Sequence, residues 1–194
     1  LAVLSEDELV YPTGTPYRLC TFSRVCKEKG IEDAVRAVIS VNEALGYTAY
    51  TLDIYGQVDS SQTDWFEQLQ ASFPSYISYC GLVPFDESTN VLKHYFALLF
   101  PTYYDGEGFA GTLIDAFSAG IPVIASDWKY NPEIVNEHVG CLYPAKDVAA
   151  LAAVLKDVSH DPSIIIEMKK SCLEESKKYE LETVVRDLLN HLKV

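Results

Sequence analysis

Residues 97–125 read ALLFPTYYDGEGFAGTLIDAFSAGIPVIA. The stretch opens with the apolar run Ala97–Phe100, which is typical of a strand buried on both faces of a parallel sheet. A turn with three glycines follows, then a predicted helix over 108–119 that Gly120 closes, then a second buried strand over 123–125. Because consecutive parallel strands need a crossover, this strand–helix–strand order predicts a parallel sheet.

The same alternation continues toward both ends of the chain. The other predicted strands are 17–22, 50–55, 75–80 and 140–143. The other predicted helices are 31–45, 64–72, 86–92 with Asp86 as N-cap, 132–137 with Asn131 as N-cap, 148–158 and, in pieces, 162–192.

Repeated strand–helix units predict an α/β fold, a Rossmann-like doubly wound parallel sheet of about six strands with helices on both faces. Ligands of such sheets bind at the carboxyl ends of the strands, near the point where the strand order reverses. Candidate residues are therefore sought in the turns after the first strand, after Phe100 and after Ala125.

Composition and charge narrow the function classes. Of 194 residues, 48% are hydrophobic and 22% are charged, which excludes a disordered chain, a collagen and a coiled-coil rod. The formal charge of −13 repels polyphosphate backbones and excludes nucleic acid from the expected partners. A small phosphate ligand stays possible, since it needs only a local cluster of donors.

Cysteine and histidine usage bears on the compartment and on metals. Five cysteines show no CxxC spacing, and four scattered histidines form no zinc-binding pair. We expect reduced thiols, a cytoplasmic protein, and neither a metal nor a cofactor. The first residues are acidic rather than basic, and no apolar run is long enough to span a bilayer.

The two ends of the chain suggest the expectation that it is a piece of a longer protein. The chain starts at Leu1 rather than at a methionine, and residues 1–16, with clustered proline and glycine, are expected to form a linker or lead-in. We expect a domain over 17–173 and a C-terminal helix over 174–194. The apolar stripe of that helix is Leu181, Val184, Val185, Leu188 and Leu192.

The turn after Phe100 admits three interpretations. Gly106, Gly108 and Gly111 match GxGxxG, and Asp127 follows sixteen residues later, as in nicotinamide-dependent enzymes. That motif belongs in the first strand–helix unit, whereas here it lies far along the chain. The glycines could instead let backbone amides at a helix N-terminus approach an anion, or supply positive φ angles for a tight turn.

The turn after the first strand concentrates cations in a chain poor in them. Arg24 and Lys29 follow that strand, where they could bind phosphate or be incidental charges of a solvated loop. Glu107 and Asp115 are eight residues apart, so they cannot form a side-by-side acid/base pair, but they could bind hydroxyls at two depths of one elongated ligand.

The central forty residues resemble the signature of group 1 (family 4) glycosyltransferases. That signature has E-G-F, seven residues to a second acid, then A-x-G-x-P-V-I-A-S-D and P-E-I-V, and residues 107–127 and 132–135 follow it in order and spacing. Ser23-Arg24 followed by Lys29-Gly30 matches the family's other motif. The resemblance extends from about residue 17 to 192.

This resemblance implies the C-terminal, nucleotide-sugar-binding half of a GT-B enzyme of the hexosyltransferase type. Such an enzyme transfers a sugar from a nucleoside-diphosphate sugar, with retention and without a metal, to a glycan or lipid-linked acceptor held by the missing N-terminal half. The implied setting is polysaccharide biosynthesis, with possible peripheral membrane association of the full protein. This chain alone is expected to be inactive.

The resemblance also assigns roles to residues. Arg24, Lys29 and the backbone of Gly111, Thr112 and Leu113 would bind the donor diphosphate. The transferred sugar would contact Glu107, as the catalytic residue, together with Gly108 and Phe109. Asp115 would bind the ribose, and Gly81, Val83 and Pro84 would lie along the base.

Two departures from the family pattern keep an alternative open. The second acid is usually glutamate, and Asp115 is one methylene shorter. Lys129 and Tyr130 stand where glycines are frequent, in a loop that faces the cleft in relatives. The alternative is a non-catalytic nucleotide-binding module with the same fold.

Overall fold

A computed structural model describes residues 3–191, apart from the side chains of Phe85, Asp187, Leu188 and His191. Its centre is a six-stranded sheet with the order β3-β2-β1-β4-β5-β6, in which every pair of neighbours is parallel. The strands are β1 (Tyr17–Phe22), β2 (Tyr50–Tyr55), β3 (Ile77–Gly81), β4 (Ala97–Phe100), β5 (Val123–Asp127) and β6 (Gly140–Pro144). The predicted Rossmann-like fold is confirmed, and the strand order reverses between β1 and β4.

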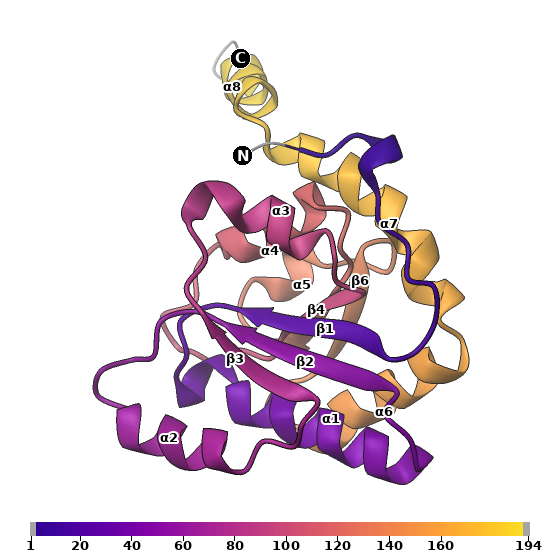
Figure 1. The fold of residues 1–194 in the computed structure, drawn as a ribbon. Helices are drawn as coiled ribbons and strands as arrows, with labels where there is room; N and C mark the ends of the chain where they lie inside the picture. Colours follow the sequence, from indigo (N-terminus) through magenta and orange to yellow (C-terminus); the bar gives the residue numbers. More distant parts are fainter. Residues whose placement is uncertain (1–2, 192–194) are drawn as a thin grey trace.

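Helices cover both faces of the sheet (Figure 1). One face packs against α1 (Ile31–Leu45), α2 (Thr63–Ala71) and α6 (Val148–His160). The other packs against α3 (Ser88–Leu92), α4 (Gly111–Ser118) and α5 (Asn131–Ile134). Side chains of β4 alternate between these two cores, Leu99 in the first and Leu98 and Phe100 in the second. This explains why its sequence is continuously apolar.

The last helix of the domain body, α7 (Ser163–Ser176), joins the two cores. Its Ile165 is buried in the first and its Cys172 in the second. The segment before β1 packs on the same helix, with Leu4 and Leu9 against Leu173. The N-terminal segment also includes the short 3-10 helix η1 (Glu6–Glu8).

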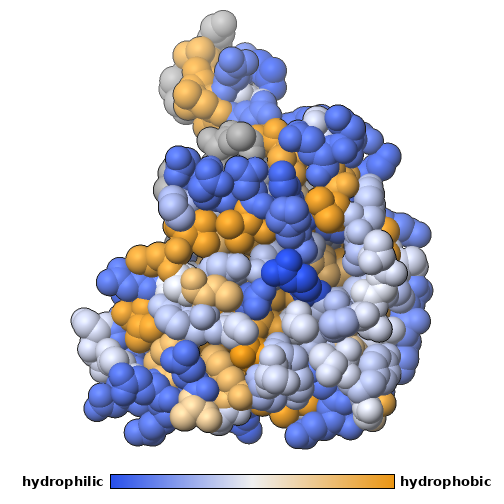
Figure 2. Space-filling model, in the orientation of Figure 1, coloured by the Kyte–Doolittle hydropathy of each residue, from blue (hydrophilic) through white to orange (hydrophobic). Residues whose placement is uncertain are grey.

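Helix α8 (Leu181–His191) follows η4 (Lys177–Tyr179) and extends away from the body (Figure 1). Apolar side chains gather along one side of it (Figure 2). They include Leu181, 78% exposed, and Val184, 49% exposed. Of the predicted apolar stripe, Leu192 and the side chain of Leu188 lie outside the described residues.

Several element boundaries differ from those predicted. The predicted bounds of β1, β2, β4 and α1 are confirmed, but α4 begins at Gly111 rather than Gly108. Asp86 is not an N-cap, because it belongs to the 3-10 helix η3 (Phe85–Glu87) that precedes α3. Asn131 lies inside α5, where its side-chain amide donates to the Ser126 carbonyl.

Gly30 is required by a close approach of two turns. It has φ +69°, and a Cβ there would collide with the carbonyl oxygen of Pro101. Gly46 has a similar φ of +73° but open space around the corresponding Cβ position.

Gly46→Ala should therefore cost about 1 kcal/mol of stability, the ordinary cost of an alanine in the left-handed conformation. Gly30→Ala should cost at least about 2 kcal/mol more, because the turns must also move apart. Denaturant unfolding of both variants measures the difference, and equal losses would contradict the close approach.

Lys169 on α7 has no exposed surface. Its Nζ donates to the carbonyls of Tyr95 and Gly120, both at 3.3 Å, which joins α7 to the segments before β4 and β5. Burial lowers the pKa of Lys169 to about 8 from an ordinary value of 10.5.

This pKa shift predicts a pH-dependent stability. Between about pH 8 and 10.5 the unfolded chain binds the lysine proton more tightly than the folded one, so stability rises with pH across this window. Across this pH window, the free energy of unfolding of the parent chain should rise by about 2 kcal/mol relative to that of Lys169→Met. Chemical denaturation of both proteins between pH 7.5 and 10 isolates this effect from other titrating groups. Parallel pH curves would show that Lys169 keeps its ordinary pKa.

Candidate functional site

A cavity of about 540 Å³ opens at the carboxyl edge of the sheet. Its walls come from the turns after β1, β2 and β3 and from the first turn of α4. The lining residues are Phe22, Ser23, Arg24, Tyr55, Gly56, Gln57, Val58, Asp59, Ser60, Leu82, Val83 and Thr112. This is the edge on which ligands of doubly wound sheets bind.

The turns after β1 and β2 continue the strand pairing and so form one rigid wall. The Val25 amide donates to the Gln57 carbonyl at 2.8 Å, and the Asp59 amide donates back to the Val25 carbonyl at 2.9 Å. Gly56, with φ +134°, lies so close to the Ser23 carbonyl that a Cβ would collide with it. The approach of these turns fixes the side chains that flank the cavity.

Arg24 is the cation in the cavity wall. Its guanidinium lies 3.5 Å from the Asp59 carboxylate and 5.3 Å from the ring centroid of Tyr104. The guanidinium is about half exposed, so these contacts orient it with little cost to its solvation. The pKa of Arg24 is raised, and the largest cause is a hydrogen bond with Tyr104.

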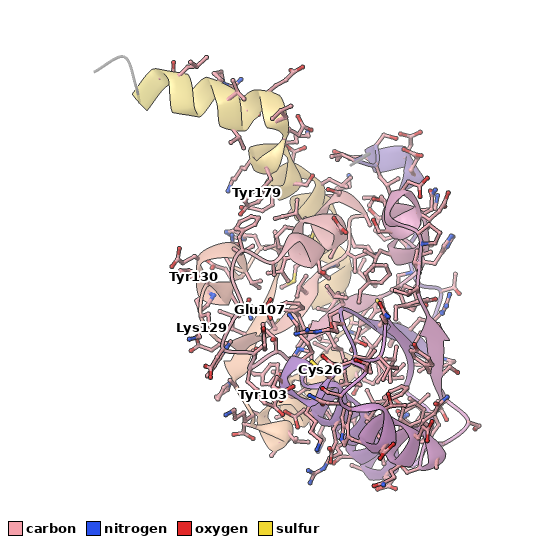
Figure 3. The ribbon with its side chains drawn as sticks, turned by 90° about the vertical axis from the view of Figure 1, so that its left-hand side faces the viewer. Cys26, Tyr103, Glu107, Lys129, Tyr130 and Tyr179 are labelled. Atoms are coloured by element: carbon pink, nitrogen blue, oxygen red, sulfur yellow. The ribbon has the colours of Figure 1, made fainter. Side chains whose placement is uncertain are left out.

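Lys29 and Glu107 form an ion pair between the turn after β1 and the turn after β4. The ammonium lies 2.8 and 2.6 Å from the two carboxylate oxygens. The side chains are only 13% and 9% exposed, and the Thr102 hydroxyl donates to the same carboxylate at 2.6 Å. Glu107 lies near the middle of this edge in Figure 3. Neither residue of the pair lines the cavity.

The N-terminus of α4 reaches the same cavity through Thr112. Its hydroxyl donates to the Phe22 carbonyl at 3.0 Å, which attaches the helix to the end of β1. The helix has no side-chain cap at Ala110. Gly108 and Gly111 have open space where a Cβ would lie, and no positive φ. Gly106 has no positive φ either, so the interpretation of the three glycines as a tight positive-φ turn is wrong.

Asp115 is set apart from the cavity. It lies in the second turn of α4, half-buried, where burial raises its pKa and a hydrogen bond with Ser88 of α3 opposes that rise. It does not line the cavity.

The residues expected along the base and the sugar lie partly at the cavity. Val83 and its neighbour Leu82 line it, Gly81 ends β3 with φ +73°, and Pro84 is not in the wall. The ring of Phe109 packs against Tyr179, with centroids 5.5 Å apart. The structure thus brings Arg24, Thr112 and Val83 to one cavity, whereas the Asp115 carboxyl of α4 contacts Ser88 of α3.

The turn after β2 was not predicted to contribute to the site. Residues Gln57–Ser60 form much of the cavity wall, and Asp59 is the partner of Arg24. The position of this turn in the chain could have indicated its role. It follows a predicted strand, β2, whose carboxyl end lies at the same edge of the sheet as those of β1 and β4.

No group of three or more metal-binding side chains occurs among the described residues. Within the same part of the chain, no helix has the length and apolar character needed to cross a membrane.

The fold and the cavity define a Rossmann-like domain with a hollow at the carboxyl edge of its sheet. Residues 16–161 match the family model of the glycosyl transferases group 1. Because the match spans well over half of the chain, the protein belongs to the group 1 glycosyltransferases.

Individual relatives agree with this assignment. The amylovoran biosynthesis glycosyltransferase AmsK of Erwinia amylovora is 27% identical over 156 residues, which are 78% of this chain and 38% of that protein. The chain spans well under half the length of the curated relatives it matches.

Two solved structures share the fold. The Anabaena protein HepE, in complex with UDP and glucose, superimposes with a TM-score of 0.77 at 16% identity, covering 91% of this chain and 48% of that one. The C-terminal domain of the group 1 protein LpcC from Francisella tularensis gives a TM-score of 0.73 at 21% identity, covering 85% of this chain and 87% of that one.

Proposed function

We propose that this chain is the donor-binding domain of a retaining, metal-independent family 4 glycosyltransferase of the hexosyltransferase type. It would hold a nucleoside-diphosphate sugar for transfer to a glycan or lipid-linked acceptor in polysaccharide biosynthesis. The observation that carries the proposal is the cavity flanked by Arg24 and the N-terminus of α4, in a chain of the group 1 family. The UDP and glucose bound by HepE support it.

Arg24, Lys29 and the backbone of Gly111–Leu113 would bind the diphosphate. Cations and a helix N-terminus both favour phosphate. Both cations are paired with carboxylates of the domain, Arg24 with Asp59 and Lys29 with Glu107. A diphosphate would therefore compete with these carboxylates for the cations.

The nucleoside would lie over the turns after β2 and β3. Leu82 and Val83 would flank the base. The neighbouring residues Gly81 and Pro84 would also lie along it. Asp115 is one methylene shorter than the usual glutamate and its carboxyl already bonds Ser88, so it would contact the ribose weakly or through a bridging water. A weak ribose contact is thus the expected consequence of aspartate at this position.

Glu107 would act on the transferred sugar as the catalytic residue, with the Gly108 and Phe109 backbone beside it. Its carboxylate is held by Lys29 and Thr102, so its position is defined before a sugar arrives. Release of Lys29 toward the diphosphate would free carboxylate oxygens for sugar hydroxyls.

The remainder of the enzyme would be an N-terminal half that holds the acceptor. The coverage of 87% of the LpcC C-terminal domain supports placing this chain as a C-terminal half. Residues 1–16 would lead in from the other half, and the exposed apolar side of α8 would dock on it. We propose a cytoplasmic location, with possible peripheral membrane association of the whole protein.

The diphosphate site predicts a selective loss of phosphate binding. Arg24→Ala or Lys29→Ala should weaken binding of a nucleoside diphosphate at least about tenfold, because each removes a charge-assisted hydrogen bond worth roughly 1.5–3 kcal/mol. The affinity of the bare nucleoside should hardly change. Arg36→Ala and Lys156→Ala remove exposed cations elsewhere and serve as controls for Arg24→Ala. For Lys29→Ala, whose side chain is mostly buried, thermal unfolding shows whether the variant is folded when binding is measured. Equal losses for nucleoside and diphosphate, measured by calorimetry, would place both residues outside the phosphate site.

Metal independence predicts that chelation has no effect. Addition of EDTA should leave nucleoside diphosphate binding unchanged, because the cations already neutralise the phosphates. The same should hold for turnover by the full-length enzyme. An absolute requirement for Mg²⁺ or Mn²⁺ would refute the metal-free mechanism.

The division of labour between two halves predicts binding without transfer. Transfer needs donor and acceptor held together, and only one wall of the cleft is proposed to lie in this chain. The 194-residue chain should fold, bind one of UDP, GDP or ADP weakly, and transfer no sugar. Calorimetry with these nucleotides and a transfer assay with several acceptors test this. Transfer by the chain alone would overturn the two-half account, and binding of none of the nucleotides would favour a degenerate module.

A further inference from the structure

A second hollow of about 320 Å³ lies at the carboxyl edge, separate from the first cavity. Its walls come from the loop before α4, the residues around the start of α5, and η4. The lining residues are Phe109, Tyr130, Glu133, Ile134 and Tyr179. None of these residues lines the first cavity.

Aromatic side chains dominate this hollow although they contribute little to either core. Phe109 is 59% exposed and Tyr130 is 52% exposed. The rings of Phe109 and Tyr179 are tilted by 52° with centroids 5.5 Å apart, so they form a corner rather than a closed stack. Exposed aromatic groups gathered around a concavity mark a binding surface.

The polar groups of the hollow favour a neutral hydroxylated ligand. Glu133 is exposed and supplies carboxylate oxygens that accept hydrogen bonds, and the two tyrosines carry hydroxyls. A pyranose ring has an apolar face of C–H groups and a rim of hydroxyls, which matches aromatic rings beside a carboxylate. An anionic ligand would be repelled by Glu133.

The hollow is lined by the same loop before α4 that carries the proposed catalytic residue. Arg24, in the nucleotide cavity, lies over the ring of Tyr104, and the Glu107 amide donates to the Tyr104 carbonyl. Phe109 follows two residues later and lines the hollow. In Figure 3, Tyr130 and Tyr179 lie on the same face of the domain as Glu107.

We propose that this hollow is a subsite for a neutral saccharide ring of the acceptor. The proposal rests on the proposed donor-binding function, because a saccharide here would lie against Phe109, two residues from Glu107. It places part of the acceptor site on the donor-binding domain itself. Tyr130 and Glu133 would then determine which acceptor is used.

The test measures saccharide and nucleotide binding by the 194-residue chain side by side. The saccharide probes are maltotetraose, cellotetraose and chitotetraose, followed by saturation-transfer NMR and calorimetry. The variants are Tyr130→Ala and Glu133→Gln. The control is Tyr47→Ala, which removes a tyrosine of similar exposure, 50%, from the turn before β2.

At least one tetrasaccharide should bind, and Tyr130→Ala and Glu133→Gln should each weaken it at least fivefold. Tyr47→Ala should leave saccharide binding unchanged, and all three variants should bind the nucleoside diphosphate as the parent chain does. Folding is checked by thermal unfolding of every variant.

Each other outcome has a distinct meaning. Nucleotide binding without binding of any tetrasaccharide would overturn the subsite and leave the proposed function standing. Saccharide binding that survives Tyr130→Ala and Glu133→Gln would place it elsewhere and also overturn the subsite. A dimer of the parent chain that Tyr130→Ala makes monomeric, with no saccharide bound, would show that a second copy covers the hollow. Saccharide binding at Tyr130 without nucleotide binding would refute the donor function and with it the acceptor role.

Discussion

The ion pair between Lys29 and Glu107 holds together the two turns that flank the switch point of the sheet. The pair is mostly buried, so removal of either partner leaves a poorly solvated charge and should cost about 3–5 kcal/mol. Gly30, next to Lys29, allows the same two turns to touch at Pro101. The position of the proposed catalytic carboxylate therefore depends on the contact between the turns that follow β1 and β4.

Under the proposed function, the same pair would link the stability of the domain to ligand binding. Arg24 and Lys29 each have a carboxylate partner, so their positive charges are largely compensated within the domain. A diphosphate would have to offer these cations better hydrogen bonds than Asp59 and Glu107 do. Under the proposed function, this exchange would limit the affinity for the nucleotide alone and would change the surroundings of Glu107 when a donor binds.

The sequence predicted what depends on local pattern and chain order. The bounds of α1 and of three strands were predicted correctly. Arg24 and Thr112 were correctly placed at the carboxyl edge of the sheet, because the sequence pattern shows where the strands end. Features set by long-range packing were not predicted. Asp59 reaches Arg24 through the register of β1 with β2, and Asp115 bonds Ser88 because the short helix α3 packs on α4. The burial of Lys169 likewise depends on carbonyls at Tyr95 and Gly120, far away in the sequence.

A crystal structure of this chain with a bound nucleoside diphosphate tests the central claim most directly. We expect phosphate oxygens within hydrogen-bonding distance of Arg24 and Lys29, at the N-terminus of α4. We also expect that Arg24 separates from Asp59 and that Lys29 loosens its contact with Glu107. A diphosphate bound elsewhere, with both ion pairs intact, would contradict the account.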